Sequence, residues 1–178
     1  TTPNDIAVAK RYLGIEDKRM RVGFGYDIHQ LKAGRPCILG GVHIESGLGP
    51  DGHSDADVLI HALMDAMLGA AGLRDIGYYF PPEDDQYKGI SSMLILEKVN
   101  FLLKERGLQA YNIDIMVISE TPKLKPHIDM MKANLQSILE IPLDRISIKA
   151  TTNEMLGAIG RREGIAAQAV VSVYEGEI

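Results

Sequence analysis

The 178-residue chain is long enough for one domain with a sizeable core, and hydrophobic residues make up 46% of it. No apolar run approaches the roughly 18 residues that span a bilayer, so the sequence predicts a soluble protein without a membrane partner. The net charge of −5 and the lack of a basic tract argue against a nucleic-acid partner, but not against phosphorylated small molecules. The single cysteine, Cys37, excludes an intrachain disulfide and is typical of a reducing compartment.

The first 19 residues differ from the rest of the chain. Asp5–Leu13 has the composition of a short helix, but nothing downstream requires it. We therefore expect residues 1–19 to be a mobile N-terminal extension, and residues 20–178 to form the domain.

The first predicted strand carries a candidate metal-binding pair. Arg21–Tyr26 alternates as a strand does and runs into Asp27 and His29. Positions 27 and 29 of a strand project to the same face, so the carboxylate and the imidazole converge. This pair is half of a site for a divalent metal ion. The alternative, an ordinary Asp and His at the surface end of a strand, remains open at this point, because the D-x-H spacing alone is weak evidence.

A glycine-turn hairpin is predicted over residues 37–44, followed by an apolar helix. We expect Ser54 to be the N-cap of this helix, with Asp57 completing a capping box. Asp57, His61 and Asp65 recur every four residues on one stripe of an otherwise apolar helix. Such charged groups need partners when buried, and a metal ion or a charged ligand would supply them. Asp55 and Asp57 could instead simply complement the positive end of the helix dipole.

His61 is the candidate to complete the site with Asp27 and His29. Two histidines and one carboxylate leave a fourth position open, as in catalytic zinc sites. The spacing also suggests that Asp65 orients His61.

The downstream elements follow from the same periodicities. We expect a loop over residues 72–85, a helix from Ser91 to Arg106, an inner strand over Tyr111–Ile118, a loop over Ser119–Lys125, a helix over Pro126–Glu140, a strand over Ile146–Ala150, a turn over Gly157–Gly164 and a strand over Ile165–Tyr174. Thr151–Glu154 follows a strand and offers hydroxyls and a carboxylate for a phosphate or a metal ion. An ordinary helix cap at Thr152 or Asn153 is the alternative.

The order of elements predicts an α+β fold, with a mixed β-sheet, helices on one face and a single domain. The residues alone therefore indicate a divalent-metal enzyme that acts on a phosphorylated compound.

Several motifs then resemble one family, the 2-C-methyl-D-erythritol 2,4-cyclodiphosphate synthases, over about residues 20–178. The motifs are RVGFGYDIH at residues 21–29, HSDAD at 53–57, HALMDAMLGAA at 61–71, DIG at 75–77, PK at 122–123, KATTNE at 149–154 and GRREGI at 160–165. The resemblance implies a homotrimer in the non-mevalonate route to isoprenoids. It implies that the 2-phosphate of 4-diphosphocytidyl-2-C-methyl-D-erythritol 2-phosphate attacks the β-phosphorus, which forms the cyclic diphosphate and releases CMP.

The resemblance also implies residue roles. Zn²⁺ would be held by Asp27, His29 and His61, and Mg²⁺ or Mn²⁺ by Glu154. His53 and Thr152 would orient phosphates and stabilise the transition state. The expected substrate-binding residues are Asp27, His29, His53, Ser54, Asp75, Ile76, Gly77, Phe80, Asp84, Ser119, Pro122, Lys123, Leu124, Lys125, Thr151, Thr152, Glu154, Ala158 and Arg161.

Three positions depart from the family pattern. Pro82 stands where the family often has Asp, Ala158 where a larger aromatic is often found, and Arg162 where Gly is common. The last two lie near a central cavity of the trimer where, by resemblance, Arg161 would meet an isoprenoid diphosphate.

The resemblance implies a cytoplasmic enzyme in a bacterium, or one in a plastid-type organelle. Two other functions stay open: a metal-dependent phosphodiesterase, in which zinc activates water, and a non-catalytic trimer that binds isoprenoid diphosphates.

Overall fold

The structure is a computed structural model that describes residues 2–13, 19–87 and 89–176. Helix α1 (Pro3–Tyr12) forms where a short N-terminal helix was expected. The predicted mobility of the extension falls in part on residues 14–18, which lie outside the described residues. Within the described ranges, none of the helices combines the length and apolar composition that a membrane span requires.

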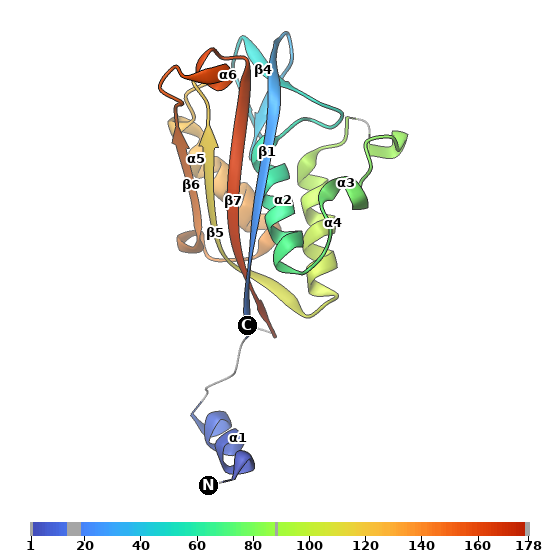
Figure 1. The fold of residues 1–178 in the computed structure, drawn as a ribbon, viewed down its shortest axis with the longest axis vertical. Helices are drawn as coiled ribbons and strands as arrows, with labels where there is room; N and C mark the ends of the chain where they lie inside the picture. Colours follow the sequence, from blue (N-terminus) through green and yellow to red (C-terminus); the bar gives the residue numbers. More distant parts are fainter. Residues whose placement is uncertain (1, 14–18, 88, 177–178) are drawn as a thin grey trace.

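A five-stranded mixed sheet forms the centre of the domain, in the order β4-β1-β7-β5-β6 (Figure 1). Its strands are β1 (Met20–Ala33), β4 (Leu48–Asp51), β5 (Leu108–Ile118), β6 (Ile146–Thr151) and β7 (Gly164–Glu175). All neighbours pair antiparallel except β5 and β6, which are parallel. The predicted hairpin is confirmed as β2 (Cys37–Leu39) paired with β3 (Val42–Ile44).

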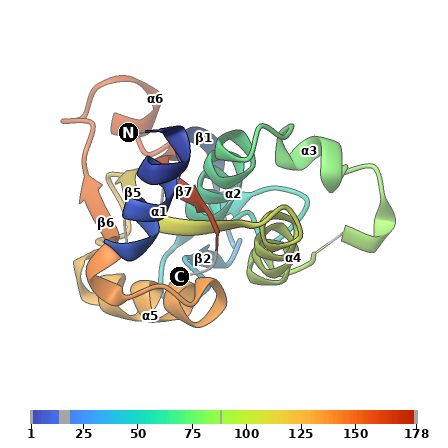
Figure 2. The same ribbon diagram turned by 90° about the horizontal axis from the view of Figure 1, so that it is seen from below.

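The long helices lie on one face of the sheet, as expected from the order of elements. Figure 2 shows α2 (Val58–Ala70), α4 (Ser92–Lys104) and α5 (Ile128–Leu139) on the same side of the strands. The shorter elements are α3 (Ile76–Tyr79), α6 (Gly157–Gly160) and the 3₁₀ turns η1 (Asp85–Tyr87), η2 (Lys125–His127) and η3 (Leu143–Arg145). The fold class predicted from the sequence is therefore confirmed as a mixed α+β domain.

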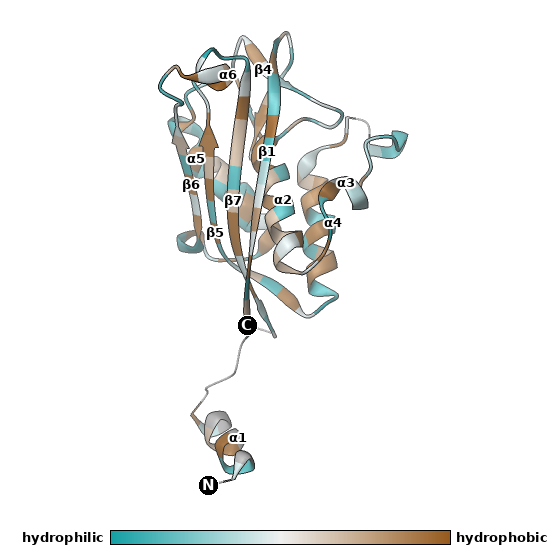
Figure 3. Ribbon diagram, in the orientation of Figure 1, coloured by the Kyte–Doolittle hydropathy of each residue, from teal (hydrophilic) through white to brown (hydrophobic). Residues whose placement is uncertain are grey.

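Helix α2 is the centre of the core and is apolar around almost its whole circumference (Figure 3). It lies directly on the backbone of β1, because Gly23 and Gly25 present no side chain there. A Cβ at Gly23 would lie 1.9 Å from the carbonyl oxygen of Ala66, and one at Gly25 would lie 2.0 Å from that of Ala62. Only glycine permits so close an approach of helix and strand.

Within the described chain, none of the three long helices covers the opposite face of the sheet (Figure 2). The residues of β1 that alternate with the two glycines point away from α2. These apolar side chains are 47–67% exposed: Val22, Phe24, Tyr26 and Ile28. Contiguous large apolar side chains exposed in this way are typical of interaction surfaces.

Three sequence predictions need correction. The N-cap of α2 is Asp57, not Ser54, because Asp57 Oδ1 accepts from the backbone N–H of Ile60 at 3.2 Å. The predicted loop over residues 72–85 contains helix α3, and strand β4 was not predicted. The predicted inner strand is confirmed, because β5 lies between β7 and β6.

We predict that Gly25→Ala lowers the free energy of unfolding by about 1–3 kcal/mol or more, because the new methyl group would overlap a helix carbonyl that cannot move aside alone. Urea unfolding measures the change. Gly47→Ala is the matched control, since a Cβ there meets nothing within 4 Å, and it should change stability by less than about 0.5 kcal/mol. Equal stability of the two variants would contradict the close approach of α2 and β1.

Candidate active site

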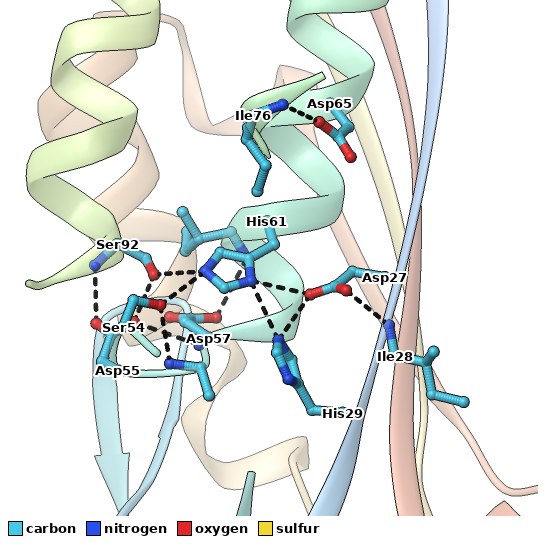
Figure 4. Close-up of polar contacts among 12 residues, drawn as sticks. Asp27, Ile28, His29, Ser54, Asp55, Asp57, His61, Asp65, Ile76 and Ser92 are labelled. Carbon is cyan, nitrogen blue, oxygen red and sulfur yellow. Dashed lines mark hydrogen bonds and ion pairs between the residues drawn. The ribbon is translucent and has the colours of Figure 1, made fainter. Parts of the chain in front are cut away.

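Three side chains that were predicted as a metal site converge between β1 and α2 (Figure 4). Asp27 Oδ2 lies 2.9 Å from His61 Nδ1 and 3.0 Å from His29 Nε2, and the two ring nitrogens are 3.2 Å apart. A tetrahedral ion with bonds of about 2.0–2.1 Å places its ligand atoms about 3.3 Å apart, so the spacing fits a zinc ion. The residues therefore meet as the sequence predicted.

The hydrogen bond of His29 to the backbone also suits a cation. His29 Nδ1 donates to the carbonyl oxygen of Asp51 at 2.9 Å, which leaves Nε2 of the neutral ring with its lone pair directed at His61. In the metal-free protein, burial of Asp27 opposes its ionisation, but its contacts with His29 and His61 outweigh this and hold its pKa well below the usual range. Burial likewise opposes the charging of His29, but Asp27 raises its pKa.

Asp57 fixes the start of the helix that carries His61. It is fully buried, and its Oδ2 accepts from the backbone N–H of Gly41 at 2.8 Å, so it joins α2 to the β2–β3 hairpin. Burial raises the pKa of Asp57 to about 6, even though backbone N–H groups stabilise its charge, and the nearby Asp55 adds to the rise.

The predicted role of Asp65 in orienting His61 is wrong. Asp65 Oδ1 accepts from the backbone N–H of Ile76 at 2.8 Å and so holds the start of α3 (Figure 4). His61 Nε2 instead faces Ser92 Oγ at 2.9 Å and Ser54 Oγ at 3.1 Å. Sequence reasoning identified Ser92 only as part of a helix, since it lies 31 residues from His61.

A cavity of about 260 Å³ opens beside the three converging side chains. Among its lining residues are seven predicted site residues: His29, His53, Ser54, His61, Ile76, Gly77 and Phe80. Pro82, Tyr87, Gly52 and Ile95 also line it and were not predicted to do so. Predicted residues Asp75 and Asp84 do not line it, and the backbone N–H of Gln86 donates to Asp84 Oδ1 at 3.1 Å.

A second cavity, of about 350 Å³, lies between the ends of β5 and β6. Its lining consists almost entirely of residues predicted to bind substrate: Ser119, Pro122, Lys123, Leu124, Lys125, Thr151 and Thr152, together with Ala150. Two lysines in this cavity give it a positive charge, which suits a phosphate group.

Glu154 lies on the exposed loop that follows β6. Thr152 Oγ1 donates to Glu154 Oε1 at 3.0 Å, and the backbones of Glu154 and Met155 are left-handed, with φ of 50° and 62°. Glu120 holds this loop, because its Oε1 accepts from the backbone N–H groups of Asn153 at 3.0 Å and Met155 at 3.1 Å. The sequence reasoning missed Glu120, which has no motif and acts across 33 residues.

The two cavities lie far apart within one chain. The register aligns Ile28 with Ala166 on β7, Ala166 with Ile118 on β5, and Ile118 with Thr151 on β6. Both parts of the predicted site therefore lie at one level of the sheet, with two strands between them. At about 4.8 Å per strand this is a separation of about 14 Å. The described residues that could jointly hold a metal ion are Asp27, His29 and His61, without Glu154.

The turn around α6 is separate from both cavities. Ala158 is exposed, and Arg161 forms a two-pronged ion pair with Glu163 at 2.8 and 3.0 Å. Arg162 has a φ of 65°, a conformation that glycine adopts without cost. This backbone suits the glycine that the resemblance leads us to expect at the position.

Comparison with known proteins supports the resemblance seen in the motifs. The model of the YgbB family matches residues 20–174. The chain belongs to the YgbB family. A relative from Synechococcus elongatus, named 2-C-methyl-D-erythritol 2,4-cyclodiphosphate synthase, is 59% identical over 152 residues, which are 85% of this chain and 95% of the relative. A relative of the same name from Thermosynechococcus vestitus is 56% identical over 158 residues, 89% of this chain and 98% of the relative.

Solved structures agree with these relatives. The IspF–CDP complex of Plasmodium falciparum is 32% identical with a TM-score of 0.78, and the match covers 89% of this chain and 97% of that one. The bifunctional IspDF of Campylobacter jejuni is 40% identical with a TM-score of 0.86. That match covers 94% of this chain but 47% of the bifunctional chain, so this chain spans about half of it.

The raised pKa of Asp57 predicts a pH dependence of stability. A carboxyl group whose pKa is higher in the folded than in the unfolded state stabilises the fold at low pH, and this contribution is lost as the pH rises through about 6. Between pH 5 and pH 7.5 the metal-free protein should therefore lose about 1–2 kcal/mol through Asp57. Urea unfolding at both values should show this loss in the parent protein but not in Asp57→Asn. An identical pH dependence in both would contradict the assignment.

Proposed function

We propose that the chain cyclises 4-diphosphocytidyl-2-C-methyl-D-erythritol 2-phosphate to 2-C-methyl-D-erythritol 2,4-cyclodiphosphate with release of CMP, as a phosphorus–oxygen lyase of non-mevalonate isoprenoid biosynthesis. The observation that carries the proposal is the convergence of Asp27, His29 and His61 beside a cavity lined by His53 and Ser54. The named relatives, at 53–59% identity, support the same activity. Residues 20–178 form the catalytic domain in this proposal, and residues 1–19 are an extension of it.

The reaction needs no nucleophile from the protein. An oxygen of the substrate's 2-phosphate forms a bond to the β-phosphorus, and the bond from that phosphorus to the bridging oxygen of the α-phosphate breaks, so that CMP leaves. The protein contributes positioning and neutralisation of charge. His53 at the first cavity and Thr152 at the second are placed to orient phosphates.

Asp27, His29 and His61 would hold the zinc ion, since their ligand atoms and lone pairs suit it. A bound zinc ion would supply positive charge to a phosphate oxygen. Glu154 would hold Mg²⁺ or Mn²⁺, because an exposed carboxylate with few protein partners suits a hard cation that also binds substrate phosphates. Ile76, Gly77 and Phe80, which line the first cavity, would contact the methylerythritol phosphate. Asp75 and Asp84 do not line the cavity, and we assign them to the same substrate contact through the loops that carry them.

We assign the second cavity to the cytidine end of the substrate. Ser119, Pro122, Leu124 and Lys125 would surround the nucleoside, and Lys123 would pair with a phosphate. Ligands named CDP in the P. falciparum structure support a cytidine nucleotide here.

A homotrimer would bring the two cavities together. Within one chain they are about 14 Å apart along the sheet. In a ring of three copies, the β6 edge of one chain can lie beside the opposite edge of the next, where β4 pairs only with Gln30–Ala33 and leaves Asp27 and His29 of β1 at the edge. Each active site then takes residues from two chains. The bare apolar face of β1 and the buried, unpartnered Asp114 Oδ1 on the same side of the sheet also fit contact with further copies.

By resemblance, the turn around α6 would lie near the central cavity of such a trimer. Arg161 would meet the diphosphate of an isoprenoid there, but it is already paired with Glu163. Binding would have to replace that ion pair, and Ala158 offers little apolar contact.

Phosphorus NMR of the reaction products tests the function. We expect the purified protein with zinc and magnesium to convert the substrate to the cyclic diphosphate and CMP. His61→Ala should contain no zinc and show no turnover, because two ligands do not hold an open tetrahedral site. A linear diphosphate product would indicate a phosphodiesterase, and isoprenoid-diphosphate binding without turnover would indicate a non-catalytic binding protein.

A mixed-trimer experiment tests where the site lies. His29→Ala and Glu154→Ala should each be inactive alone, because every site of either protein lacks one metal ligand. When the two are unfolded and refolded together, some activity should return, since some interfaces then contain both intact halves. Native mass spectrometry checks that mixed trimers form. Mixed trimers without activity would place the whole site within one chain.

A further inference from the structure

His61 presents its two ring nitrogens to different surroundings (Figure 4). Nδ1 faces Asp27 and His29, and Nε2 faces Ser92 and Ser54. A neutral imidazole carries one proton, so a ring that offers the Nδ1 lone pair to a metal ion must carry its proton on Nε2. A hydrogen-bond acceptor at Nε2 therefore determines whether His61 is ready to bind metal.

Ser92 has the environment of such an acceptor. It is fully buried, so water does not replace it, and its Oγ lies 2.9 Å from His61 Nε2. Its hydroxyl donates to Asp55 Oδ1 in a short hydrogen bond, and its backbone N–H donates to Asp55 Oδ2 at 2.8 Å. Since the hydroxyl proton is directed to Asp55, the lone pairs of Ser92 Oγ remain for the Nε2–H of His61.

Ser54 is less suited to this task. Its Oγ lies farther from His61 Nε2, at 3.1 Å, and already accepts from the backbone N–H of Ala56 at 3.2 Å. Ser54 also lines the first cavity, whereas Ser92 does not. Because Ser92 is the acceptor for His61 Nε2, the hydroxyl of Ser54 remains available to a substrate phosphate.

We propose that Ser92, held by Asp55, is a positioning residue that fixes the proton of His61 on Nε2 and so directs Nδ1 to the metal ion. This inference rests on the proposed metal site, and it adds two residues, Asp55 and Ser92, that neither line the cavity nor bind the ion. The Asp55–Ser92 contact also ties the start of α4 to the loop before α2. The orientation of His61 therefore depends on the position of α4 as well.

The test measures zinc affinity by competition with a chromogenic chelator, without substrate. We expect Ser92→Ala to bind zinc about 10–100-fold more weakly than the parent protein, the range typical for loss of a partner behind a metal ligand. The visible spectrum of the cobalt-loaded protein, which reports coordination geometry, should change as well.

Ser91→Ala is the matched control. Ser91 is the N-cap of the same helix, where its Oγ accepts from the backbone N–H of Met93 at 3.3 Å, but it does not contact His61. The Ser91 variant should lose about 1 kcal/mol of stability and keep the zinc affinity and cobalt spectrum of the parent protein.

Asp55→Asn provides a second variant. An amide accepts at one oxygen only, whereas the carboxylate accepts from both the hydroxyl and the N–H of Ser92, so zinc affinity should again fall. If Ser92→Ala and Asp55→Asn bind zinc as tightly as the parent protein, the inference is overturned. An equal loss in Ser91→Ala would also overturn it, since the effect would then come from the helix end. A parent protein that binds no zinc would refute the metal site itself.

Discussion

The contact between helix α2 and strand β1 is the constraint on which the rest of the structure depends. Because Gly23 and Gly25 carry no side chains, the carbonyl groups of α2 reach the backbone of β1. Asp27 continues the same face of the strand, and His61 lies next to the helix residue that meets Gly25. The packing that closes the core thus also sets the spacing of the candidate metal ligands. A bulkier strand would move His61 away from Asp27.

Local patterns account for the parts of the structure that the sequence predicted. Alternation along a strand places Asp27 and His29 on one face, and the glycine turn defines the hairpin of residues 37–44. The helix start was misplaced because Ser54 and Asp57 are both good N-cap residues. Contact with the hairpin decides between them, since Asp57 also accepts from Gly41 across 16 residues. No local pattern contains that contact.

Distant contacts explain the remaining errors. Asp65 has the helical spacing of a partner for His61, but its carboxylate accepts a hydrogen bond from the backbone N–H of Ile76. Ser92, on another helix, contacts His61 instead. Strand β4 contains Gly49 and Pro50, which are typical of turns. It nevertheless pairs with Gln30–Ala33 of β1. Gly49 fits there because the carbonyl oxygens of Arg35 and Pro36, just after β1, lie only 2.3 Å from the position that a Cβ of residue 49 would take.

Two features of the sheet are left incomplete in a single chain: an exposed apolar row and a proposed active site in two separate parts. The row Val22, Phe24, Tyr26 and Ile28 exposes apolar surface to water. The candidate metal ligands on β1 and the lysine-lined cavity beside β6 are separated by strands β7 and β5 of the same sheet. They are too far apart to hold adjacent phosphates of one substrate directly. The proposed homotrimer answers both, because packing the sheets together covers the apolar row while it brings unlike edges into contact. In the proposed trimer, the burial of this apolar row, which would stabilise the assembly, would also complete the active site.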